Sequence, residues 1–114
     1  MSGPTAKVRE LVWQRAEGRC ERCFLPITGG DHSIHHRRPR GMGGSSDPAT
    51  NSPANLLLLC GSGVTGCHGW VETHRELAYQ TGLLVHRWQD PRDVPLIGRC
   101  LTDEGTYAPL PEAG

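Results

Sequence analysis

The 114-residue sequence has few aromatic side chains, no long apolar run and no net charge. Hydrophobic residues make up 36% of it and include a single Phe, whereas it holds 15 Gly and 9 Pro. A core this small for the chain length usually needs a metal ion or disulfides to stabilise the fold. The longest apolar run is LLLLC at residues 56–60, which is far too short to span a membrane, so we expect no membrane partner.

The sequence also has no signal for export. Its first residues contain no positively charged segment followed by an apolar block, so no secretory signal peptide is predicted. We therefore expect a cytoplasmic protein. Because thiols stay reduced in the cytoplasm, five Cys in such a chain indicate metal ligands before they indicate disulfides.

Charge is distributed unevenly along the chain. Residues 1–40 carry eight Lys or Arg and four acidic residues, whereas residues 89–114 carry two and five. Three arginines follow the dipeptide His35-His36 in the basic part, namely Arg37, Arg38 and Arg40. Guanidinium groups bind phosphate, so we expect a polyanion such as DNA to bind there.

The length suits one compact domain of the α+β class. Apolar residues at helical spacing predict one helix over residues 5–17 and a second over residues 68–81. Strands are predicted over residues 33–36 and 83–88, and one or two short strands over 90–107. The run NLLLL, at 55–59, is predicted to be a buried strand or half-turn, since periodicity does not distinguish them.

Four of the five cysteines fall into two pairs. Cys20 and Cys23 form C-x2-C, and Cys60 and Cys67 form C-x6-C. Thiolates at C-x2-C spacing bracket a tight turn, and a second pair completes a tetrahedron. We predict a structural Zn2+ ion there that stabilises the small core, rather than four thiols without a shared role.

The C-x6-C loop is wider than usual, and its glycines at 61, 63 and 66 make the wider turn sterically possible. Cys100 remains unpaired, and we interpret it as a small hydrophobic residue. Because His68 follows Cys67 directly, the ion would bring His68 close to the His35-His36 pair.

A second, open metal site is predicted around His68. Glu72 lies four residues further along the predicted helix, on the same face, and His35 would complete a His-His-carboxylate set. His74 is an alternative third ligand, but it lies about 240° around the helix from His68. That position is on the apolar stripe, which favours a partly buried core histidine.

Adjacent residues of a strand point to opposite faces, so His35 and His36 cannot have the same role in the same place. If His35 faces the metal, His36 is free to act as a base that takes a proton from water near neutral pH. The alternative for the dipeptide is two solvated surface histidines.

Together these residues resemble the HNH endonucleases, and more narrowly the small zinc-bound phage and prophage type. The motifs that carry the resemblance are Cys20 with Cys23, His35-His36 before Pro39, Gly43-Gly44, Asn55-Leu56, Leu59-Cys60 and Cys67-His68. The resemblance implies a ββα-metal (His-Me finger) core with a four-Cys zinc knuckle, an N-terminal helix and a short β extension. It implies a single nuclease domain over 1–114, with its core at about 13–88 and the extension at 89–114.

The activity implied by the resemblance is hydrolysis of phosphodiester bonds in DNA. His36 stands where the family has its general base, and Asn55 is the N of the motif, expected to fix the loop that carries His36. His35 and His68 stand where the family has ligands of a catalytic divalent ion, expected to be Mg2+ or Mn2+, with Ni2+ as an alternative.

One position departs from the family pattern. Family members often have a further His four residues after the one that His68 matches, and here that residue is Glu72. The third ligand is therefore left between Glu72, His74 and water.

By analogy alone, the resemblance suggests a phage protein that works beside the terminase during DNA packaging, in the cytoplasm of a bacterial host. A rival interpretation is a four-Cys zinc module that binds DNA through its arginines without cutting it. Another is a structural adaptor in which the histidines have no role. Both explain the cysteines, but neither explains the placement of the histidines and Asn55.

Overall fold

The computed structural model describes residues 3–39 and 49–109. Arg40 and Gly43-Gly44, which belong to the predicted arginine cluster and motifs, lie outside the described residues. A two-stranded antiparallel sheet lies between helices, and its strands are β1 (His32–His36) and β2 (Leu56–Cys60). The predicted α+β class is confirmed.

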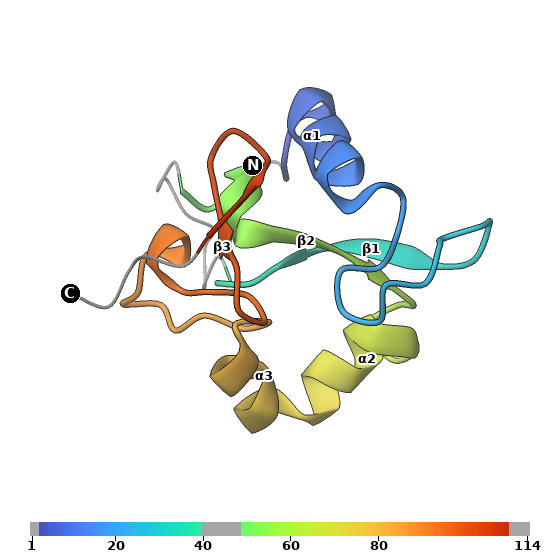
Figure 1. Ribbon diagram of the computed structural model, residues 1–114. Helices are drawn as coiled ribbons and strands as arrows, with labels where there is room; N and C mark the ends of the chain where they lie inside the picture. The colour runs from blue at the N-terminus through green and yellow to red at the C-terminus, as the bar shows by residue number, and fades with distance from the viewer. Residues whose placement is uncertain (1–2, 40–48, 110–114) are drawn as a thin grey trace.

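Helices cover both sides of the sheet. α1 (Ala6–Ala16) packs on one face of β2, while α2 (Gly66–Thr73) packs on the other and α3 (Arg75–Thr81) follows it (Figure 1). Of the helices within the described ranges, none is long and apolar enough to cross a membrane.

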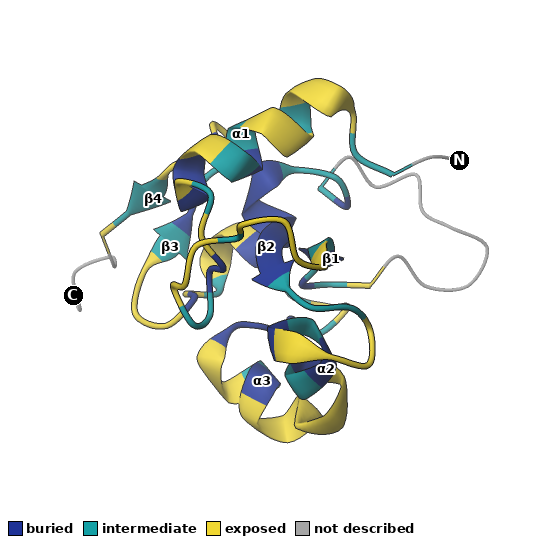
Figure 2. Cartoon of the chain, turned by 90° about the vertical axis from the view of Figure 1, so that its right-hand side faces the viewer, coloured by how far each residue is buried: buried dark blue, intermediate teal, exposed yellow. Residues whose placement is uncertain are grey.

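The leucine run forms β2 because both of its faces are covered. Leu56 and Leu58 join the apolar cluster beneath α1, whereas Leu57 and Leu59 join the larger cluster beneath α2 and α3. All four are buried, and β2 is the dark strand at the centre of the molecule (Figure 2). A strand buried on both faces needs apolar residues at every position, so the open choice over these residues is resolved in favour of a strand.

The first predicted helix is confirmed as α1. Thr5 caps its start, because its Oγ1 accepts a hydrogen bond from the backbone N–H of Val8 at 3.2 Å. Glu17 and Gly18 end it with φ values of 56° and 70°, in the left-handed region. This turn leads directly into the first cysteine pair.

The second predicted helix is divided in two. α2 ends at Thr73 and α3 begins at Arg75, because His74 adopts φ −130° and ψ 51°, outside the helical region. The prediction of one continuous helix over 68–81 is therefore wrong. His74 is exposed and its ring stacks on Trp70, with centroids 4.5 Å apart, so the prediction of a partly buried core histidine is also wrong.

Residues 83–88 do not form the predicted strand. Leu84 and Val85 are buried, but their backbone N–H groups donate to the carbonyls of Ala78 and Arg37 rather than to a neighbouring strand. An apolar run that is buried without pairing to another strand has the same sequence pattern as a strand, so the prediction of a strand here is wrong.

The short strands predicted over residues 90–107 are present as a small hairpin near the end of the described residues. β3 (Cys100–Leu101) pairs antiparallel with β4 (Tyr107–Ala108), and short 3-10 turns lie at Pro53–Asn55 and Pro91–Asp93. Leu101 joins the larger apolar cluster, so this hairpin contributes to the core.

A buried ion pair fastens the hairpin and α1 to the sheet. Arg15 donates two hydrogen bonds of 2.8 Å to the carboxylate of Glu21, and both side chains are 1% exposed. The same carboxylate accepts the backbone N–H of Leu58 at 2.8 Å and the hydroxyl of Tyr107 at 2.5 Å. Loss of one partner from such a pair typically costs about 3–5 kcal/mol.

Candidate metal centres

The four predicted cysteines come together in one cluster. Their sulfur atoms all lie within 4.8 Å of one another, and the sulfurs of Cys23 and Cys60 are 3.9 Å apart. A tetrahedral zinc site with bonds of about 2.3 Å has sulfurs about 3.8 Å apart. The four cysteines are thus positioned to hold a metal ion, in a geometry compatible with structural zinc.

Backbone N–H groups point at the sulfurs of this cluster. The N–H groups of Arg22 and Cys23 approach Cys20 Sγ at 3.4 and 3.5 Å, and that of Cys67 approaches Cys60 Sγ at 3.5 Å. Burial acts to raise the pKa of the Cys20 thiol, but the N–H donors of the knuckle outweigh it and lower that pKa to about 7. This thiol therefore loses its proton readily, as a metal ligand must.

For Cys67, another thiol of the cluster, burial is not outweighed. It raises the pKa of Cys67 to about 12, although the guanidinium of Arg22 donates to this sulfur at 3.3 Å and acts to lower that pKa. Without a cation, four thiolates packed this closely would repel one another. Binding of a divalent ion would offset that repulsion and so favour the folded chain.

Two glycines allow the wide C-x6-C loop. Gly61 and Gly66 have φ values of 86° and 62°, and a Cβ on Gly66 would lie 2.7 Å from the Cα of Gly61. The structure shows the wide loop that these glycines were expected to make possible, and at these two positions it requires glycine. Gly63 meets nothing within 4 Å, so no close contact requires a glycine there.

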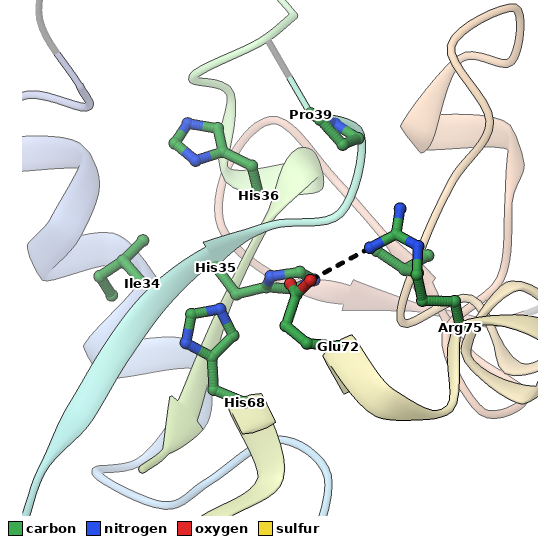
Figure 3. Close-up of a pocket in the computed structure, with 8 residues that line it drawn as sticks. Ile34, His35, His36, Pro39, His68, Glu72 and Arg75 are labelled. Atoms are coloured by element: carbon green, nitrogen blue, oxygen red, sulfur yellow. Dashed lines mark hydrogen bonds and ion pairs between the residues drawn. The ribbon is translucent and has the colours of Figure 1, made fainter. Parts of the chain in front are cut away.

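The second predicted cluster also forms. Ligand atoms of His35, His68 and Glu72 all lie within 4.8 Å of one another. His35 comes from β1, and the other two come from one face of α2, four residues apart (Figure 3). The cluster lines a cavity of about 290 Å3, and Glu72 rather than His74 is the third member.

Hydrogen bonds fix which nitrogen of His68 can bind a metal. Its Nδ1 lies 3.0 Å from Ser33 Oγ, and the Ser33 hydroxyl donates its own proton to the carbonyl of Gly61 at 3.0 Å. Ser33 must therefore accept from His68, so Nδ1 carries the proton and Nε2 keeps a lone pair. Such outer hydrogen bonds orient metal-binding histidines.

His35 is held in the same way. Its Nε2 lies 2.9 Å from the carbonyl oxygen of Leu83, which can only accept, so Nε2 carries the proton and Nδ1 keeps the lone pair. Burial, with a smaller contribution from His68, lowers the pKa of His35 to about 4. The ring therefore stays neutral at physiological pH, which is the state that binds metals.

His36 lies on the other side of β1 but lines the same cavity (Figure 3). Its Nε2 is 2.8 Å from Asn51 Oδ1, so Nε2–H donates and Nδ1 is left with a lone pair that can accept a proton. Asn51 was not among the predicted site residues, because nothing in its local sequence marks it as a partner of His36.

Asn55 supports the backbone after His36. It is fully buried, its Oδ1 accepts from the N–H of Arg38 at 2.8 Å, and its Nδ2 donates to the carbonyls of Arg38 and Thr50 at 3.1 and 2.8 Å. It is not among the residues that line the cavity. This placement matches the predicted role of fixing the loop.

Arg37 does not lie on the surface, so the prediction that it contacts DNA is wrong. The side chain is completely buried, and burial lowers its pKa to about 10. Its guanidinium donates to four backbone carbonyls, those of Ala54, Gly82, Pro91 and Val94, over distances of 2.5–3.1 Å. These bonds use four of its five N–H groups, and its complete burial keeps the side chain away from any DNA phosphate.

Two other arginines lie nearer the surface. Arg38 is half-buried, and its Nη1 donates to the carbonyl of Gln89 at 2.8 Å. Arg75 lines the cavity and its Nη1 lies 3.1 Å from Glu72 Oε1, the contact drawn in Figure 3. Arg75 was not predicted, although its position three residues after Glu72 places the two side chains on one side of the helical segment.

No protein-family model, curated protein or solved structure matches this chain. Three features of the described residues bear on its function: a closed cluster of four thiols, an open His-His-Glu cluster, and a further histidine on the wall of the cavity that this second cluster lines.

Proposed function

We propose that this protein is a metal-dependent DNA endonuclease of the HNH type, in which β1, β2 and α2 form a ββα-metal core. One observation carries the proposal. The ligand atoms of His35, His68 and Glu72 lie within 4.8 Å of one another, and His36 lines the same cavity from the opposite side of β1. A metal site with open positions beside an imidazole that is not one of its ligands is the arrangement that metal-assisted hydrolysis needs.

The donor set fits a divalent cation. Two imidazoles with defined tautomers and one carboxylate suit Mn2+ and Ni2+, and Mg2+ where water completes the shell. When bound, the ion would supply Lewis-acid stabilisation of the negative charge that develops on the scissile phosphate and the leaving oxygen.

His36 would act as the general base. Its Nδ1 takes a proton from a water molecule, whose oxygen attacks phosphorus while the bond from phosphorus to the leaving oxygen breaks. The contact from Nε2–H to Asn51 orients the ring and favours the imidazolium that forms. Asn55, which is buried, holds the backbone after His36 in place through its hydrogen bonds to Arg38 and Thr50.

Arg75 would bind the substrate phosphate. Its guanidinium already lies on the cavity wall against the carboxylate of Glu72, and its side chain is 46% exposed. A guanidinium group in this position can donate hydrogen bonds to phosphate oxygens and steer a DNA strand toward the cavity. Arg75 thus takes the role that was predicted for Arg37.

The test is nicking of supercoiled plasmid with Mg2+, Mn2+ or Ni2+. We expect the wild-type protein to nick, and His36→Ala to be about 10²- to 10⁴-fold slower while it keeps its zinc and its affinity for DNA. His32→Ala is the matched control, because His32 lies on the same strand but is exposed and does not line the cavity. It should cut like the wild type.

Other outcomes would contradict the proposal. A wild-type protein that binds DNA but never cuts it with any of these ions would be a non-catalytic zinc module. A protein that neither binds nor cuts would be a structural adaptor. Equal loss of cutting in His36→Ala and His32→Ala would remove the argument for a base at position 36.

A further inference from the structure

Three aromatic rings form a continuous stack outside the metal clusters. The ring centroids of Tyr79 and His86 are 3.9 Å apart with planes 3° from parallel, and those of His86 and Trp88 are 4.5 Å apart with planes 4° from parallel. Trp88 is at the end of the stack and is 76% exposed. An indole this exposed, with its plane set by a supporting ring, offers a flat face for another ring.

A turn holds the rings of His86 and Trp88 face to face. The backbone N–H of His86 donates to Gln89 Oε1 at 3.1 Å, and the N–H of Gln89 donates to the carbonyl of His86 at 3.0 Å. Tyr79 supports the stack from α3. The stack is therefore formed in the protein itself and needs no ligand to order it.

The stack adjoins the cavity on the side of α3. Arg75, which lines the cavity, lies with its guanidinium carbon 5.9 Å from the centre of the Tyr79 ring, and its Nη2 donates to the Tyr79 hydroxyl at 3.4 Å. Leu84 lines the same cavity two residues before His86. A strand bound at the cavity would thus pass beside the stack.

The segment after β1 also links the stack to the cavity. Arg38 donates to the carbonyl of Gln89, the residue after Trp88. Pro39, which follows Arg38, lines the cavity. One guanidinium group, that of Arg75, thus contacts the Tyr79 ring, and a second, that of Arg38, donates to the residue after Trp88. This charge favours an anionic partner that also carries flat rings over an apolar protein segment.

We propose that the exposed face of Trp88 stacks on an unpaired base of a DNA strand that enters the cavity, so that the site takes single-stranded or locally opened DNA. Aromatic stacking of this kind accepts any base, because every base has a flat π-face. The choice of DNA as the strand rests on the proposed function, but the stacking itself needs no cutting.

The test is binding, measured without added Mg2+, Mn2+ or Ni2+ on the zinc-loaded full chain. Fluorescence anisotropy compares a short labelled oligothymidylate with an oligonucleotide of the same length built from abasic residues, which keeps the phosphates and lacks the bases. We expect the wild type to bind the oligothymidylate about tenfold more tightly, the size of one stacked base.

Variants then assign this preference to Trp88. Trp88→Ala should bind both probes equally, Trp88→Phe should keep most of the preference, and Leu25→Ala should behave like the wild type because it removes an exposed apolar side chain in the cysteine knuckle. None of these residues lines the cavity. Thermal unfolding midpoints close to that of the wild type would show that each variant is folded.

Two results would overturn the inference. In one, Trp88→Ala keeps the preference for bases, which would leave the indole face to a protein partner. In the other, the wild type does not distinguish the two probes. Failure of plasmid nicking would instead contradict the endonuclease and leave the binding result intact, so the two proposals can fail separately.

Discussion

The two candidate metal clusters share α2 and the sheet but differ in how they are closed. The cysteine cluster has four ligands of one kind and N–H donors around its sulfurs, so no position is left for a substrate. The His-His-Glu cluster has three ligands, one of them exposed, on the wall of a cavity. Closed sites of the first kind stabilise folds, whereas open sites of the second kind carry out reactions.

Neighbouring residues serve the two clusters. Cys67 belongs to the first and His68 to the second, and both lie in the first turn of α2. Successive side chains of an α-helix are about 100° apart, so one turn can direct adjacent residues to different sites. The stabilising ion would therefore also set the direction of a ligand for the reactive ion.

The largest expected effect is loss of the fold in Cys67→Ser. Structural zinc contributes about 10–16 kcal/mol of apparent binding free energy, which is as large as the whole stability of a small domain. We expect the variant to contain no zinc and to be unfolded by circular dichroism. Cys100→Ser, outside the cluster, should stay folded with its zinc, and a folded Cys67→Ser with a normal melting temperature would contradict this division.

His68→Ala should distinguish the roles of the two clusters most clearly, because His68 directly follows Cys67 but belongs to the other cluster. We expect it to stay folded with one zinc ion while Mn2+ binding, measured by electron paramagnetic resonance, is lost. Nicking should fall about 10²-fold or more, because the ion would supply several kcal/mol of transition-state stabilisation. If this variant unfolds like Cys67→Ser, the second cluster also has a structural role.

Ser33→Ala should have an intermediate effect. It removes the acceptor that holds the Nδ1 proton of His68, and loss of such an outer partner typically costs about 10- to 100-fold in metal affinity or activity. Calorimetric titration with Mn2+ measures the affinity. Ser33→Thr keeps a hydroxyl and should restore most of it, and equal affinities in all three proteins would show that the bond does not orient the ring.

Glu72→His should have the smallest effect and change metal choice rather than activity. A third imidazole favours Ni2+ and Zn2+ over Mg2+ and Mn2+. Nicking rates with each ion, each at saturation, should shift by a few-fold toward Ni2+. Glu76→His, on exposed α3 and away from the cavity, should leave the order of metals unchanged.

The sequence predicted the parts of both clusters that depend on local spacing. The pair Cys20 and Cys23 and the pair His68 and Glu72 each lie within one turn of the chain, so spacing alone indicates a shared direction. The sequence left the third ligand open, and the structure groups Glu72 with the two histidines. The break in the helix at His74 was not predicted, because a continuous helical pattern does not reveal it.

Contacts between distant segments were not predictable. Arg37 looked like a surface arginine because Arg is rarely buried, and its four carbonyl acceptors lie between 17 and 57 residues away. The partner of His36, Asn51, and the buried pair of Arg15 and Glu21 depend in the same way on how the segments pack.

The buried guanidinium at position 37 also ties the C-terminal segment of the described chain to the candidate site. Two of its acceptors, the carbonyls of Pro91 and Val94, belong to the segment after residue 88. A shortened protein that stops at 88 would leave a cation in the interior without them, directly beside the proposed base. Any attempt to transplant this cleft into a fusion protein should therefore retain the chain past Val94. Because Leu101 joins the core and Tyr107 donates to the buried Glu21, it should continue through Ala108, where β4 ends.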